Sequence, residues 1–182
     1  MRLFFCVELD DGVRRTLAEH AGRLRPQVGG GTWVAQDNLH ITLRFLGEVA
    51  EAALPGLAEV GRTAATGIAP FTLAVDTLGA FPSPRRARVL WAGPARESGP
   101  FTALALAIED GVLRLGFPPE TKPALPHITL ARFRSPRDLS GALAGATLPP
   151  LAVEVRQVTL MRSELCPQGP LYTSLSRWPL GG

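Results

Sequence analysis

Two copies of the tetrapeptide His-Ile-Thr-Leu hold the residues of this chain that are best suited to chemistry. The first copy spans His40 to Leu43 and the second spans His127 to Leu130, so close to half of the 182 residues separates them. Two of the three histidines therefore occur in the same local sequence, once in each half of the chain. This arrangement is typical of an internal duplication with a pseudo-two-fold axis.

Each motif is predicted to form a strand that presents histidine and threonine on one face. Residues i and i+2 of a strand point the same way, so His40 and Thr42 should share a face while the two apolar residues point into the core. His127 and Thr129 should be arranged in the same manner. If the axis places the strands side by side, two imidazoles and two hydroxyls converge on one small volume.

These four groups suit an in-line displacement at phosphorus. One neutral imidazole can take a proton from water while the other, as imidazolium, gives a proton to the leaving oxygen. An unperturbed histidine titrates near pH ~6.5, so both forms are accessible at neutral pH. The hydroxyls of Thr42 and Thr129 can donate hydrogen bonds to the non-bridging oxygens. A single histidine in a strand is more often structural, and it is the pairing that favours catalysis.

The remaining sequence predicts one α+β domain over residues 1–182, with repeats centred on 40–43 and 127–130. Hydrophobic residues make up 46% and charged residues 19%, which is typical of a globular protein. No linker separates the halves, and strands and helices mix without strict alternation, which favours antiparallel sheets. We expect strands at 2–9, 40–46, 71–78, 87–92, 127–130, 151–161 and 171–178, and helices at 13–24, 51–65, 100–115 and 137–143.

Several other classes of protein and site are disfavoured. No segment approaches the roughly 18 apolar residues of a membrane-spanning helix, and Cys6 and Cys166 have no metal-ligand spacing. We expect a soluble cytoplasmic monomer without metal or other cofactor. The net charge of +3 permits a nucleic-acid partner. Six arginines could guide an RNA backbone or form two solvated loops: Arg85, Arg86, Arg88, Arg132, Arg134 and Arg137.

The paired motifs resemble the two-histidine (2H) phosphoesterase superfamily, whose mark is His-x-Thr/Ser-x twice with x apolar. More closely, the chain resembles the bacterial and archaeal RNA 2′,3′-cyclic phosphodiesterases, also called 2′-5′ RNA ligases. The likeness covers most of the chain and lies in Met1 to Leu9, Asn38 to Glu48, Arg88 to Gly93, Leu115 to Glu120, Pro126 to Arg132 and Gly169 to Tyr172.

The resemblance implies a bilobal fold with two pseudo-symmetric antiparallel sheets around a central cleft and helices on the outside. It also implies hydrolysis of a terminal RNA 2′,3′-cyclic phosphate to a 2′-phosphate without metal, and reversible 2′-5′ ligation as a side activity. By analogy His40 is the proton donor and His127 the proton acceptor. Arg132 corresponds to the arginine that follows the family's second motif and would bind the phosphate.

Strict strand alternation raises a difficulty for Arg132 and suggests a second arginine. Arg132 lies five residues after His127 and would point away from the cleft, so a bulge or the strand's end must turn it inward. Arg44 lies four residues after His40, shares the predicted cleft face and is a further candidate for phosphate binding. Phe4 could stack on a base or pack against the second lobe.

Two alternatives remain open from the sequence. The same site could act on small cyclic phosphates or on 2′-5′ oligonucleotides. In a different class, the chain could bind RNA ends without turnover. The third histidine, His20, lies on the apolar stripe of the first predicted helix and is interpreted as structural.

Overall fold

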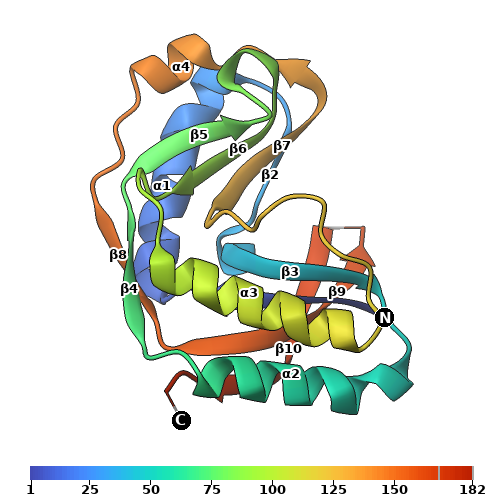
Figure 1. Cartoon of the computed structure of the whole chain (residues 1–182). Helices are drawn as coiled ribbons and strands as arrows, with labels where there is room; N and C mark the ends of the chain where they lie inside the picture. Colours follow the sequence, from blue (N-terminus) through green and yellow to red (C-terminus); the bar gives the residue numbers. More distant parts are fainter. Residues whose placement is uncertain (168, 182) are drawn as a thin grey trace.

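The computed structural model describes residues 1–167 and 169–181, which form an eight-stranded and a two-stranded antiparallel sheet (Figure 1). The predicted α+β class is confirmed. The strands are β1 (Arg2–Glu8), β2 (Thr32–Trp33), β3 (His40–Glu48), β4 (Phe71–Val75), β5 (Thr77–Phe81), β6 (Ala87–Gly93), β7 (Ile128–Arg137), β8 (Leu151–Val155), β9 (Gln157–Cys166) and β10 (Gly169–Pro179). The helices are α1 (Asp11–Val28), α2 (Leu54–Thr66), α3 (Gly99–Arg114) and α4 (Ser140–Ala144), with 3-10 turns η1 (Gln36–Asn38), η2 (Glu51–Ala53) and η3 (Pro84–Arg86).

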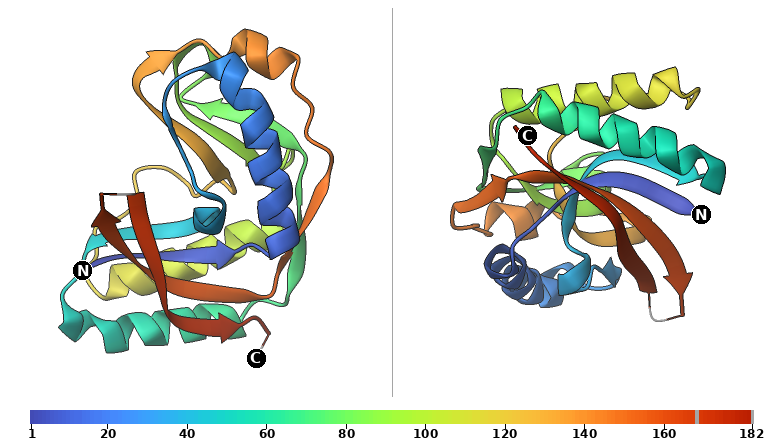
Figure 2. Two further views of the ribbon diagram at one scale, coloured as in Figure 1. Left: turned by 180° about the vertical axis from the view of Figure 1, so that it is seen from behind. Right: turned by 90° about the horizontal axis from the view of Figure 1, so that it is seen from below.

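The eight-stranded sheet consists of two halves, each belonging to one lobe. Its strand order is β10-β9-β1-β3-β7-β6-β5, with β2 paired to β7. The His40 lobe contains β10, β9, β1 and β3, against which α2 and α3 pack; the His127 lobe contains β7, β6, β5 and β2, with α1 and α4. The small β4–β8 sheet runs along one side between the lobes, and α1 and α3 lie on opposite sides of the molecule (Figures 1 and 2).

The same order of elements occurs twice along the chain. The series β1, α1, β3, α2, β4, β5 is followed by β6, α3, β7, α4, β8, β9. The last strand of each series lies in the other lobe: β5 pairs with β6 in the His127 lobe, and β9 pairs with β1 in the His40 lobe. We infer an internal duplication from this order, as the paired motifs predict.

The two halves of the large sheet meet where β3 pairs with β7. In the described part of the chain this contact is a single antiparallel pair, Ile41 opposite Ile128. Both isoleucines are fully buried, so the seam is apolar on its core side. The symmetric parts of the fold are thus two halves of one sheet joined at the motifs, with the cleft between them.

Two strands predicted as continuous are each divided in the structure. The segment 71–78 changes from the small sheet to the large sheet at Asp76, and the segment 151–161 does so at Arg156. Leu73 and Val75 are buried in β4, whereas Ala80 is buried in β5, so the buried positions change from odd to even numbers. A chain that turns from one sheet into another must shift its inward face in this way.

Smaller differences concern the ends of elements. The predicted helix at 137–143 begins only at Ser140, because β7 continues through Arg137. Helix α1 is longer than the predicted 13–24 and begins after Asp10, whose side chain accepts a 2.8 Å hydrogen bond from the Val13 backbone N–H. Among the described residues, no helix has the length and apolar character needed to cross a membrane.

Candidate active site

The seam between β3 and β7 brings the four motif side chains together. With Ile41 opposite Ile128, antiparallel register places His40 opposite Thr129 and Thr42 opposite His127. Side chains directly opposite in such a pair have Cβ atoms about 4.5–5.5 Å apart. All four line one cavity of about 540 Å³ at the interface of the lobes. The motifs therefore converge on one volume.

Backbone carbonyls orient both imidazoles in the same way. His40 Nδ1 lies 2.7 Å from the Asn38 carbonyl oxygen, and His127 Nδ1 lies 2.7 Å from the Leu125 carbonyl oxygen. A carbonyl can only accept, so each Nδ1 carries a proton and Nε2 is left to exchange protons with a ligand. His40 Nε2 also lies 3.1 Å from the hydroxyl of Thr42.

The site disfavours the charged form of both histidines. Burial lowers the pKa of His40, and the positive charges of Arg132 and His127 lower it further. Burial also lowers the pKa of His127, with Arg132 again contributing. Hydrogen bonds to the Asn38 and Leu125 carbonyls oppose these shifts in part. The described lining of the cavity holds no acidic side chain, so a bound anion would supply a countercharge and would favour imidazolium.

A bulge after each motif determines which arginine faces the cavity. Cys6 pairs with Thr42 and Phe5 with Arg44, so Leu43 is an extra residue on β3. In β7 the register skips Leu130 in the same way. After each bulge, the fifth residue from the histidine faces the cavity and the fourth faces the opposite side. Arg132 therefore lines the cavity, because the bulge turns its side chain inward as phosphate binding would require. Phe45 takes the equivalent position on β3.

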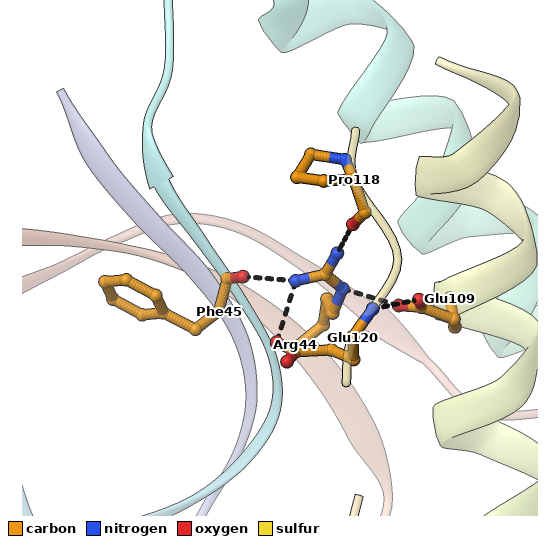
Figure 3. Close-up of polar contacts among 5 residues, drawn as sticks. All are labelled: Arg44, Phe45, Glu109, Pro118 and Glu120. Atoms are coloured by element: carbon orange, nitrogen blue, oxygen red, sulfur yellow. Dashed lines mark hydrogen bonds and ion pairs between the residues drawn. The ribbon is translucent and has the colours of Figure 1, made fainter. Parts of the chain in front are cut away.

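The expectation that Arg44 shares the cleft face is wrong for the same reason. Arg44 is buried and is not among the residues that line the catalytic cavity. Its guanidinium donates to Glu109 at 2.5 Å, to Glu120 at 2.8 Å and to the Pro118 carbonyl (Figure 3). Arg44 therefore ties α3 to the loop between α3 and β7, which leads into His127.

Aromatic rings pack around both histidines. The Phe4 ring centroid is 4.9 Å from that of His40, and the Tyr172 ring meets His40 edge-on at 5.3 Å. On the other side Phe81 meets His127 edge-on at 5.1 Å and packs on Trp91 at 5.2 Å. Phe4 is 3% exposed, so it supports His40 rather than offering a free stacking face.

Several residues that line the cavity were not identified as site residues from the sequence. Tyr172 and Ser163 come from the β9–β10 hairpin, more than a hundred residues after His40. Asn38 donates from its side-chain amide to the Pro170 carbonyl at 2.8 Å, which joins the hairpin to the chain before β3. No local pattern marks such residues, because only the pairing of β9 with β1 brings them near. Among the described residues, no group of three histidine, cysteine, aspartate or glutamate side chains is arranged to hold a metal ion.

Comparison with known proteins identifies the family. Residues 7–91 and 93–172 match the family model described as LigT like Phosphoesterase. The chain belongs to this family. It is therefore a phosphoesterase, and the resemblance noted in its paired motifs is confirmed.

Relatives of this LigT-like phosphoesterase match over nearly the whole chain. A protein of Thermus thermophilus named RNA 2′,3′-cyclic phosphodiesterase is 38% identical over 191 residues, covering 100% of this chain and 91% of the relative. A protein of the same name from Methanothermobacter thermautotrophicus is 33% identical over 181 residues, covering 96% of each chain.

Solved structures confirm the fold of this LigT-like phosphoesterase. A crystal structure from Thermus thermophilus aligns with a TM-score of 0.83 at 37% identity, covering 100% of this chain and 99% of the other. Escherichia coli LigT complexed with 3′-AMP aligns with a TM-score of 0.77 at 31% identity, covering 100% and 98%.

The buried Arg44 cluster generates a prediction about stability. Arg44→Met leaves Glu109, itself largely buried, without its cation, and breaking a buried pair in this way should lower the free energy of unfolding by about 3 kcal/mol. Arg62→Met removes the exposed ion pair with Glu59 and should cost no more than about 1 kcal/mol. Denaturant unfolding of both variants measures the difference. Equal stability of Arg44→Met and wild type would contradict the assigned role.

Proposed function

We propose that this protein hydrolyses a terminal RNA 2′,3′-cyclic phosphate to a 2′-phosphomonoester. The observation that carries the proposal is the pairing of Ile41 with Ile128, which directs two oriented imidazoles into one cavity. The names of the relatives supply the substrate class. We also propose that the protein acts as a monomer in the cytoplasm, as expected from its sequence.

The proposed reaction is one in-line displacement. The oxygen of a water molecule attacks phosphorus as its proton passes to Nε2 of His127. The bond from phosphorus to O3′ breaks, and the proton on Nε2 of His40 passes to O3′. The products are a 2′-phosphate and a free 3′-hydroxyl. No step requires a metal ion, because the two imidazoles carry both proton transfers.

Three side chains are proposed to bind the phosphate. Thr42 and Thr129 lie beside the histidines on the cavity face and can donate hydrogen bonds to the non-bridging oxygens. Arg132 is exposed and lines the same cavity, so its guanidinium can reach the anion and stabilise charge that develops on it. Arg44 is left out of this set because its guanidinium is committed to Glu109 and Glu120.

The reaction itself is tested with a short RNA that ends in a 2′,3′-cyclic phosphate, incubated with the protein in EDTA. The proposal predicts a 2′-phosphate end, identified by chromatography against both phosphomonoester isomers. Conversion of small cyclic phosphates but not of RNA would show that the same mechanism acts on a different substrate. Tight binding of RNA that remains unchanged over hours would favour an RNA-end-binding protein instead.

Removing either catalytic histidine should abolish most of the turnover. His40→Ala and His127→Ala should each lower kcat by about 10²–10⁴-fold, the usual contribution of a positioned acid or base. The matched control is His20→Ala in α1, which removes the remaining histidine and should stay within about twofold of wild type, because no proton transfer depends on it. Circular dichroism checks that all three variants fold. A near wild-type rate in either motif variant would contradict the paired scheme.

The pKa shifts predict an acidic optimum for kcat/KM. In the free enzyme both imidazoles lose their protons below the ordinary value of about 6.5, since burial disfavours the charged form. The state with one charged and one neutral imidazole is therefore most populated below that pH. The substrate anion raises both pKa values, so the profile of kcat should lie at higher pH than that of kcat/KM. An optimum of kcat/KM above pH ~7.5 would contradict this account.

A further inference from the structure

A groove rich in arginine continues from the catalytic cavity along β7. It encloses about 360 Å³ and is lined by Gly31, Thr32, Arg132, Phe133, Arg134, Ser135 and Arg137. Arg132 also lines the catalytic cavity, so the two spaces share one wall. Thr32 pairs with Arg132 where β2 and β7 run side by side (Figure 1). The groove therefore leads away from the reacting phosphate.

The charged side chains that line this groove are all positive. Three of the lining residues are arginines, and in residues 1–167 and 169–181 Arg132, Arg134 and Arg137 form no ion pair. Asp138 follows directly in the sequence, but its carboxylate accepts hydrogen bonds from Ser140 and does not line the groove. Basic residues gathered along one strand are the expected footprint of a nucleic-acid backbone.

The spacing and orientation of the arginines suit a single strand of RNA. Arg132 and Arg134 are two residues apart in β7, so their side chains leave the same face about 6.6 Å apart. Arg137 donates to the Val28 carbonyl at 3.3 Å and lies 5.9 Å from the Phe133 ring centroid. These contacts hold its guanidinium beside the groove. The row of three cations is therefore long enough for more than one phosphate.

The groove offers hydrogen-bond donors to a phosphate and no free surface to a base. Phe133 is the one aromatic residue in the described lining, and it is only 5% exposed. The hydroxyls of Thr32 and Ser135 add donors to those of the guanidinium groups. Contacts to phosphate fix the position of a strand without reading its sequence. The groove should therefore bind different RNA sequences equally well.

We propose that this groove binds the backbone phosphates of the RNA on the 5′ side of the reacting nucleotide. The inference rests on the proposed function, because a 2′,3′-cyclic phosphate ends an RNA strand and the rest of the strand extends from it in the 5′ direction. Phosphates held there add binding energy that a mononucleotide cannot supply. The enzyme is then selective for a chain of RNA over a single nucleotide with the same cyclic phosphate.

The wall of the catalytic cavity gives the strand a path to the groove. The reacting nucleoside is bonded to the leaving O3′ and so lies on the side of His40. Asn38 and Val34 line the cavity there, and Thr32, two residues before Val34, lines the groove. A strand that follows this wall passes Arg132 and continues along β7.

The test compares uridine 2′,3′-cyclic phosphate with a short RNA that ends in the same nucleotide. The measured quantity is the ratio of kcat/KM for the RNA to kcat/KM for the mononucleotide, which is insensitive to a general loss of catalysis or folding. Arg134→Gln and Arg137→Gln should each lower this ratio by about fivefold, as expected for loss of one exposed ion pair. Arg62→Gln is the control, because it removes the same charge from an exposed position of α2 and should leave the ratio unchanged.

Two further measurements identify the contact as one with phosphate. The slope of log kcat/KM for the RNA against log salt concentration should become shallower by about 0.7 in Arg134→Gln, the share of one phosphate of a single strand. Neutral methylphosphonates, placed at one upstream position at a time, should lower kcat/KM of wild type. At the position that Arg134 binds, the same replacement should have no further effect in Arg134→Gln.

The outcomes separate this inference from the proposed function. A ratio that is unchanged in both arginine variants would overturn the inference, and so would a loss that depends on the upstream base sequence. Failure of wild type to hydrolyse either substrate would refute the proposed function instead.

Discussion

The antiparallel contact between Ile41 and Ile128 is the constraint on which the rest of this structure depends. It is the single pair that joins β3 to β7 in the described chain, and so it joins the two halves of the large sheet. The same contact sets the register in which each histidine lies opposite the threonine of the other motif. Apolar burial of the two isoleucines thus serves the fold and the site together. A cavity of about 540 Å³, lined by residues of both lobes, lies over this seam.

The bulges after the two motifs explain why equivalent positions differ in chemistry. Each bulge turns the fifth residue after the histidine into the cavity, which gives Arg132 on one side and Phe45 on the other. A cation and an aromatic ring at symmetric positions make a duplicated scaffold asymmetric, as a reaction with distinct entering and leaving groups requires. The fourth residue faces away, and on β3 it is Arg44, which fixes the loop that leads to His127 (Figure 3).

The sequence predicts the elements and the four central side chains because local periodicity determines both. His40 and Thr42 project from a strand whose alternate residues are apolar, and that pattern is visible without a structure. The break at Asp76 was not predicted, because the segment 71–78 was expected to be one strand and the change of sheet follows from pairing with distant strands. The orientation of Arg44 was predicted wrongly, because a bulge depends on pairing with β1 and leaves no local mark. The place of Tyr172 likewise depends on contacts between distant strands.

The central claim is that His40 protonates the leaving oxygen while His127 accepts the proton of the nucleophile. It is tested most directly with a cyclic substrate in which sulfur replaces O3′, because a thiolate, from a thiol of pKa about 8.5, leaves without protonation. The account predicts that His40→Ala recovers to within about tenfold of wild type on this substrate, while His127→Ala stays impaired. Recovery of His127→Ala alone, or equal impairment of both variants, would contradict the assignment.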